Sequence, residues 1–142
     1  MLYTVCYISN SVQLWQKTHL DSLFSLAKQR NISLDVTGLL LYNEGTFVQV
    51  LEGERKVVHS LFSKIKNDKR HNQLTLMMDR EIDDRLFNSY QTSSVAFGDL
   101  KELTKLESRI LLPKTSKYTK SLWAILKPFF SIRQVGIKGY GI

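Results

Sequence analysis

The stretch 35–53, DVTGLLLYNEGTFVQVLEG, constrains the fold of this chain more than any other. Four apolar residues at 39–42 are typical of a strand buried on both faces. Asn43 and Gly45 favour a tight turn, because Gly accepts a positive φ and Asn tolerates it. The returning strand, 46–51, places Gln49 between apolar neighbours. A buried amide without partners costs about 1–3 kcal/mol, so we expect a polar group over this face of the sheet.

The length and the cysteine count narrow the class of protein. A chain of 142 residues is enough for one domain with a substantial core and a short appendage. The single cysteine, Cys6, excludes a disulfide framework and fits a reducing, cytoplasmic setting. The first residues, MLYTVCYIS, predict a strand and not a signal peptide, since a basic start is missing. No apolar stretch approaches the roughly 20 residues of a transmembrane helix.

The excess of basic residues is confined to the last third of the chain. The net charge is +7. Residues 1–99 hold 11 Lys and Arg against 11 Asp and Glu, whereas residues 100–142 hold 9 against 2. We therefore expect an electrically neutral domain followed by a basic segment suited to an acidic partner.

Hydrophobic periodicity predicts the element order β-α-β-β-α-β followed by one more strand. Thr18 is expected to cap the first helix, with Asp21 in its first turn. This order is typical of an α+β, ferredoxin-like sheet with both helices on one face. The strands are expected at about 2–9, 39–42, 46–51, 74–78 and 93–97, and the helices at about 18–29 and 54–67.

The second face of the predicted sheet needs a cover. It is apolar through Cys6, Ile8, Val48 and Val50. We expect the chain itself to supply this cover, with a domain at 1–98 and a basic helical extension at 99–142 that covers the second face. The capping-box pattern of Asp99 and Glu102 predicts one helix there, and the apolar stripe within 119–127 predicts another.

Tyr7 and Gln49 are the pair best suited to functional chemistry. Each is predicted on the helix-facing side of its strand. A phenol can donate a proton and, with an oxidising partner, an electron, while an amide can reverse its hydrogen bonding by rotating. The pair either grips a polar aromatic ligand between the two helices or forms a hydrogen bond inside a core. The residues alone favour the core interpretation.

Asn31 and the segment 68–71 lie where the sequence first suggests a structural role. Asn31 follows the first predicted helix, where Asn commonly serves as a C-cap. Arg70 and His71 follow the second helix, where cations suit the helix dipole, although Arg70 can also bind a phosphate. The three histidines are too dispersed to predict a zinc site, and the chain has no glycine-rich phosphate loop.

A set of short motifs occurs in the order and with the spacing of one known family. They are Tyr7-Ile8-Ser9, Asn31, Val36-Thr37-Gly38-Leu39-Leu40, Phe47-x-Gln49-x-Leu51-Glu52-Gly53, Asp68-x-Arg70-His71 and Arg85-x-Phe87. On these motifs, residues 2–97 resemble the BLUF family, whose domains sense blue light using FAD. The resemblance implies a ferredoxin-like fold that holds the flavin non-covalently between its first two helices, without a Rossmann fingerprint.

The resemblance also implies roles for individual residues. Tyr7 would donate an electron to the excited flavin, and Gln49 would lie between Tyr7 and the flavin and change its hydrogen bonds after light. Ser9 would support that network. Asn31 would pair with the pyrimidine edge of the flavin, for which an amide has complementary groups. The other cofactor-binding residues would be Leu23 and Ile65 as walls of the ring, and Arg70 and His71 along the ribityl and phosphate side.

The chain departs from the family on the fifth strand. The usual Trp-x-Met is replaced by Tyr90-Gln91-Thr92. Thr92 has a hydroxyl where Met has a flexible thioether. Tyr90 and Thr92 are therefore the positions at which we expect signal transmission to differ from the family.

The output of such a chain is expected to be a changed surface and not a reaction. The resemblance implies a short, stand-alone photoreceptor that signals through a protein partner, an acidic one if the basic extension binds it, or through an oligomer. Two alternatives stay open. One is a ferredoxin-like nucleic-acid-binding protein that uses the basic extension, and the other is an enzyme of the same fold with Arg70 or His71 as the catalytic residue.

Overall fold

The computed structural model describes residues 1–12, 15–43, 45–94, 105, 108 and 116–127; the side chains of Lys17 and of residues 91–94 also fall outside the description. The chain divides into two compact units, Met1–Ser94 and Val95–Ile142. Among the helices in the described ranges, none has the length and apolar character needed to cross a membrane.

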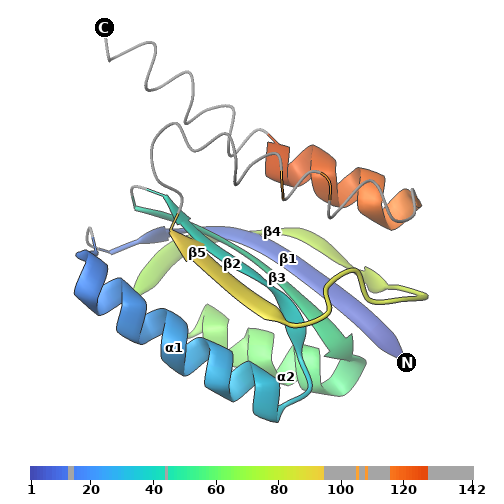
Figure 1. The fold of residues 1–142 in the computed structure, drawn as a ribbon, viewed down its shortest axis with the longest axis horizontal. Helices are drawn as coiled ribbons and strands as arrows, with labels where there is room; N and C mark the ends of the chain where they lie inside the picture. Colours follow the sequence, from blue (N-terminus) through green and yellow to red (C-terminus); the bar gives the residue numbers. More distant parts are fainter. Residues whose placement is uncertain (13–14, 44, 95–104, 106–107, 109–115, 128–142) are drawn as a thin grey trace, which may run out of the picture. The chain divides into compact units, whose positions relative to one another are not determined.

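The first unit is a five-stranded sheet with the strand order β4-β1-β3-β2-β5. The first four strands pair antiparallel, and β5 joins β2 in parallel. Figure 1 shows α1 and α2 on the same face of this sheet. The predicted ferredoxin-like arrangement with a fifth strand is confirmed. The elements are β1 (Leu2–Ser11), α1 (Lys17–Ser33), β2 (Thr37–Asn43), β3 (Thr46–Glu54), α2 (Arg55–Lys66), β4 (His71–Glu81) and β5 (Tyr90–Ser94).

The hairpin of β2 and β3 lies near the centre of the sheet, as its apolar pattern predicted. Gly45 in its turn has a φ of +88°, the region that Gly adopts at little cost. Gly38 on β2 has a φ of +149°, and a Cβ there would lie 1.9 Å from the carbonyl oxygen of Val50. No other residue type fits at position 38 without moving the backbone of β3.

The first helix is longer at both ends than the sequence predicted. Its N-cap is Gln16 and not Thr18, and no acidic residue lies in its first turn, so Asp21 does not act on the dipole there. The helix continues to Ser33, which places Asn31 inside its last turn and not at the C-cap. The Ser33 hydroxyl and the Leu34 N–H both donate to the Arg30 carbonyl, at 2.7 and 3.1 Å. These bonds satisfy the terminal carbonyl without an Asn cap.

The fifth strand begins three residues before its predicted start at 93. Its register with β2 pairs Tyr90 with Gly38 and Thr92 with Leu40. The prediction was wrong because β5 has no apolar alternation of its own and is defined by pairing with β2. The predicted part beyond Ser94 lies outside the described residues. The strand β4 also exceeds its predicted range of 74–78, since it pairs with β1 along almost its whole length.

The central strands of the sheet have buried side chains on both faces. The core between the sheet and the two helices includes Tyr3, Val5, Leu20, Phe24, Leu40, Leu51, Val58, Leu61 and Tyr90. Three of the residues predicted for the second face are also buried, namely Cys6, Val48 and Val50. The second helix packs through one apolar face, on which Val58, Leu61 and Ile65 are buried.

In the second unit the structure describes a helix at 117–127. Ser116 caps it: the Ser116 hydroxyl accepts from the Thr119 N–H at 3.1 Å, and the Thr119 hydroxyl accepts from the Ser116 N–H at 2.8 Å. Leu122 and Leu126 are fully buried. The apolar stripe predicted for 119–127 is therefore a real helix face. The helix predicted to begin near Asp99 lies outside the described residues.

Candidate functional site

A pocket of about 320 Å³ lies between the sheet, α1 and α2. Its volume is within the range of small-molecule sites. The walls are mostly apolar, and the polar groups lie on β1, α1, β3 and the residues that follow α2. The lining residues are Tyr7, Leu23, Leu26, Ala27, Arg30, Leu40, Phe47, Gln49, Ile65, Asp68, Arg70 and His71. Six of the predicted cofactor-binding residues are among them: Tyr7, Leu23, Gln49, Ile65, Arg70 and His71.

Tyr7 and Gln49 are paired directly across β1 and β3. Both side chains are buried, and the Gln49 Nε2 donates to the Tyr7 hydroxyl. Burial raises the pKa of Tyr7, and the hydrogen bond from Gln49 opposes only part of that rise. Tyr7 therefore keeps its proton at neutral pH and can give it up only together with an electron or to a strong base.

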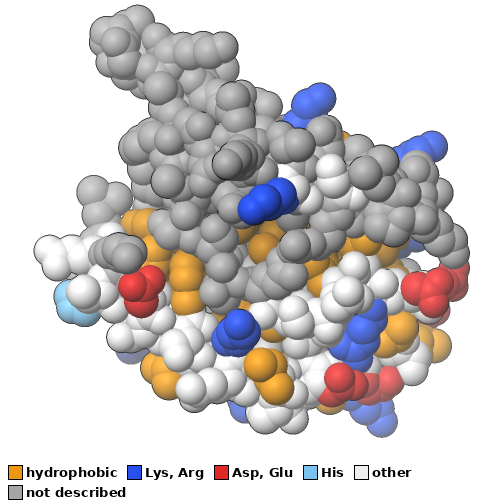
Figure 2. All heavy atoms as spheres, viewed as in Figure 1, with side chains coloured by type: hydrophobic (Ala, Val, Ile, Leu, Met, Phe, Trp, Pro, Cys, Tyr) orange, Lys and Arg blue, Asp and Glu red, His pale blue; other side chains and the backbone are white. Residues whose placement is uncertain are grey.

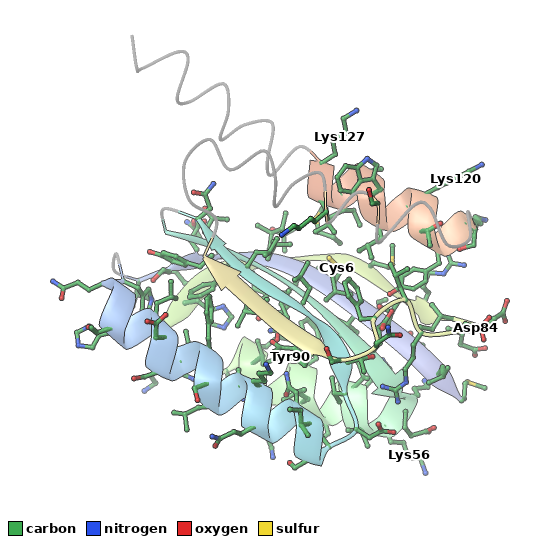
Figure 3. The ribbon with its side chains drawn as sticks, viewed as in Figure 1. Cys6, Lys56, Asp84, Tyr90, Lys120 and Lys127 are labelled. Carbon is green, nitrogen blue, oxygen red and sulfur yellow. The ribbon has the colours of Figure 1, made fainter. Side chains whose placement is uncertain are left out.

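Tyr90 contributes a second hydroxyl to the same amide. Its hydroxyl donates to Gln49 Oε1, from the strand β5 at the edge of the sheet. The side chain is 1% exposed, and Figure 3 shows it on the side of the sheet that carries the helices. Its pKa is raised, first by burial and then by the nearby Tyr7. The sequence analysis singled out Tyr90 but not this bond, because the predicted start of β5 was wrong and its register with β2 was not predicted.

Ser9 reaches the pocket through His71. The Ser9 hydroxyl lies 2.7 Å from His71 Nδ1, and His71 Nε2 lies 2.6 Å from the carbonyl oxygen of Ile65. A carbonyl can only accept, so in the neutral ring Nε2 carries the proton and Nδ1 accepts from Ser9. Ser9 thus fixes the orientation of a ring that forms part of the pocket wall.

Asn31 is buried in the last turn of α1, next to the pocket residue Arg30. Its Oδ1 accepts from Arg30 Nε at 3.1 Å. Its Nδ2 has no hydrogen-bond partner among the described residues. A buried donor without a partner is costly, which is a sign of a site that expects a ligand acceptor. The carbonyls of a flavin pyrimidine edge are acceptors of this kind, so the residues present fit a flavin.

Arg70 is held by Asp68 at the pocket rim. Arg70 Nη2 lies 2.5 Å from Asp68 Oδ2, and Arg70 Nε lies 3.0 Å from Asp68 Oδ1. This two-point bond lowers the pKa of Asp68, the hydrogen bond from Arg70 being the largest cause. The sequence missed Asp68 and Arg30 as pocket residues. The Asp68-x-Arg70 spacing was a usable signal, because it allows a carboxylate to fix a guanidinium two residues away.

Thr92 shares a row of the sheet with the central pair. Its backbone is in register with Leu40, and Leu40 is in register with Gln49. The Thr92 side chain lies outside the described residues, so its role in signal transmission stays a prediction.

Comparison with known proteins shows what this chain is similar to. The family described as sensors of blue-light using FAD (BLUF) matches residues 2–93. The alpha subunit of the photoactivated adenylate cyclase of Euglena gracilis is 41% identical over 88 residues, which cover 62% of this chain and 9% of that protein. The chain therefore spans about a tenth of the length of this curated relative.

Solved structures agree with that match. Klebsiella pneumoniae BlrP1 with FMN and cyclic diGMP has a TM-score of 0.75 and 28% identity, over 92% of this chain and 36% of that one. The dark-state structure of BlrB, a BLUF protein, has a TM-score of 0.63 and 28% identity, over 87% and 96% of the two chains.

Proposed function

The chain belongs to the BLUF family of blue-light sensors, and from this premise we propose that Tyr7 and Gln49 carry out its photoreaction in the pocket between α1 and α2. It is a flavin-binding, light-sensing domain. The observation that supports the proposed site is the buried hydrogen bond between Gln49 and Tyr7 at a pocket of about 320 Å³.

The flavin of this chain is proposed to be FAD. The family description names FAD, whereas the similar Klebsiella structure was solved with FMN. The Arg70 guanidinium is about half exposed at the pocket rim, where it can add a phosphate contact to its bond with Asp68. Flavin released by denaturation and separated by chromatography distinguishes the two cofactors.

Each protein group then has a definite task. When bound, the flavin supplies the absorption of blue light and the capacity to accept an electron. Tyr7 supplies that electron and its proton, since the raised pKa keeps the phenol neutral beforehand. Gln49 rearranges its hydrogen bonds by rotating its amide. Leu23 and Ile65 would exclude water from the flavin ring, and Asn31 Nδ2 would donate to its pyrimidine edge.

The signal is proposed to pass to another protein, and the chain itself is proposed to catalyse no reaction. The match covers 9% of the cyclase, so the activity of that relative does not carry over to this chain. The surplus of basic residues at 100–142 favours an acidic partner, with an oligomer of this chain as the other route. The lone cysteine supports a cytoplasmic setting.

Residues 99–142 are proposed to be a helical extension that covers the second face of the sheet. Two properties support the proposal. The second face is aliphatic through Cys6, Val48 and Val50, and the helix at 117–127 has a buried apolar stripe with Lys117, Lys120 and Lys127 exposed. Burying such a stripe contributes about 1.5–3 kcal/mol per large side chain before entropy is subtracted.

The alternatives have no comparable support. A nucleic-acid-binding sheet of this type stacks bases on exposed aromatic residues, whereas this second face is aliphatic. On the face of the first unit that Figure 2 shows, the Lys and Arg side chains lie among Asp and Glu side chains. For the enzyme alternative, His71 has both ring nitrogens engaged and Arg70 is bound by Asp68.

Absorption spectroscopy tests the proposed function. The purified full chain is expected to be yellow with a flavin spectrum, and blue light is expected to shift that spectrum reversibly to the red. A colourless protein that takes up no flavin on reconstitution would end this proposal.

A further inference from the structure

The amide of Gln49 lies between two phenols that come from opposite directions. Tyr7 is on β1, one strand away from Gln49, and Tyr90 is on β5, two strands away on the other side. Tyr90 reaches across β2 at the level of Gly38, its partner in the parallel register. Because Gly38 has no side chain, nothing on β2 at that level stands between the Tyr90 ring and β3.

The hydrogen bonds of this trio have a definite direction. Gln49 Nε2 donates to the Tyr7 oxygen, and the Tyr90 hydroxyl donates to Gln49 Oε1. In this orientation the Tyr90 hydroxyl proton is in a hydrogen bond to Gln49, whereas the Tyr7 hydroxyl proton is not. Both phenols are buried and have raised pKa values, so both keep a proton to donate.

Rotation of the amide by 180° exchanges these roles. Gln49 Oε1 would then accept from the Tyr7 hydroxyl, and Gln49 Nε2 would donate to the Tyr90 oxygen. A phenol is both a donor and an acceptor, so each of the two orientations leaves the amide with two partners. An indole N–H, which the family usually has at this position, only donates and would oppose the amide N–H in the rotated orientation.

We propose that Tyr90 is a positioning residue that stabilises both orientations of the Gln49 amide, the present one as a donor and the rotated one as an acceptor. The proposal rests on the photoreaction proposed above and adds a consequence for it. The orientation in the structure is the resting one, and the rotated orientation lasts longer with Tyr90 than it would with an indole.

Flavin-free protein tests the contact itself. In full-length, ¹⁵N-labelled protein, the Gln49 side-chain resonance is assigned by its loss in Gln49→Leu. Tyr7→Phe is expected to move the Nε2 resonance most, because it removes the acceptor, and Tyr90→Phe is expected to move it measurably. The control is Tyr42→Phe, a buried tyrosine on β2 whose hydroxyl accepts from the Trp15 N–H and not from Gln49. It should leave the resonance in place.

Flavin-loaded protein tests the consequence. Tyr90→Trp is expected to retain flavin and the red shift but to recover in the dark about 2–10-fold faster than wild type or more. The rotated state loses one hydrogen bond of about 0.5–1.5 kcal/mol, and the indole N–H also opposes the amide N–H. Tyr90→Phe is expected to recover at a rate between the two, and Tyr42→Phe at the wild-type rate.

Different results would contradict the proposed photoreaction and the proposed role of Tyr90. A wild type that binds flavin but shows no red shift would overturn the proposed function. Two outcomes would overturn the role of Tyr90 while leaving the photoreaction in place. One is a Gln49 resonance that does not shift in Tyr90→Phe, and the other is a Tyr90→Trp variant that recovers no faster than wild type.

Discussion

Glu52 on β3 accepts the backbone N–H of Phe87 at 3.0 Å, although the two residues lie 35 positions apart. The carboxylate is fully buried and also accepts from the Leu86 N–H at 2.9 Å and from the Thr37 hydroxyl at 3.0 Å. A buried carboxylate is tolerated only with such charge-assisted bonds. Glu52 thereby fixes the segment that leads into β5, and with it the position of Tyr90.

Replacing this carboxylate by an amide should destabilise the fold. In Glu52→Gln one oxygen becomes an NH₂ group that faces donors, so the free energy of unfolding is expected to fall by about 1–3 kcal/mol. Urea unfolding measures it. Glu81→Gln, an exposed carboxylate on β4, is the control and should change stability by less than about 0.5 kcal/mol. Equal stability of the two variants would contradict the anchoring role of Glu52.

The central pair should separate photochemistry from binding. Tyr7→Phe removes only a hydroxyl from the pocket, so flavin binding is expected to persist, while the red shift disappears with the donor of electron and proton. Gln49→Leu should do the same, since no amide remains to rearrange. Flavin content and light-minus-dark spectra measure the two effects. A normal photocycle in either variant would show that the photoactive centre lies elsewhere.

Thr92 should affect kinetics more than cofactor content. Its backbone shares a row with Gln49, two strands away. Replacing Thr92 by Met restores the usual thioether and removes a hydroxyl, so dark recovery is expected to change by about 2–10-fold, as for one hydrogen bond, with flavin content unchanged. A recovery trace that coincides with wild type would place the Thr92 side chain outside the network.

Cys6 should make the fold sensitive to alkaline pH. Burial raises its pKa from the ordinary value of 9.0 to about 12. Between these two values only the unfolded chain loses the thiol proton, so unfolding becomes easier as the pH rises. Under reducing conditions, wild type is expected to lose about 1.4 kcal/mol more than Cys6→Ala between pH 8 and pH 10, measured by urea unfolding. Parallel pH profiles of the two proteins would show that the folded thiol ionises normally.

Removal of the extension should weaken the domain more than its flavin site. Truncation after Phe97 exposes the aliphatic second face if the extension covers it, so the shortened protein is expected to aggregate or to melt at a lower temperature. Its flavin content should fall less, because the pocket lies on the helix face. A truncated chain as soluble and stable as the full one would refute the covering role. It would then favour a partner or a membrane surface as the target of the extension.

The sequence determined those parts of this protein that depend on local pattern. Three patterns predicted the element order: the alternation along the strand that contains Tyr7, the apolar run before Gly45 and the helical periodicity of α2. Such periodicity shows which face of an element is buried. The same patterns placed Tyr7 and Gln49 on the helix-facing side. The spacing of the motifs then identified the family, because a cofactor site needs particular groups at particular separations.

Only the tertiary structure decided which distant groups meet. The bond from Tyr90 to Gln49 depends on the parallel register of β5 against β2, and the burial of Glu52 depends on backbone groups 34 and 35 residues away. Neither follows from a local pattern, because strand pairing and loop anchoring are set by long-range contacts. The position of Asn31 beside the pocket could not be predicted from local pattern either. It depends on the length of α1, which is set by the packing of the helix and its terminal hydrogen bonds.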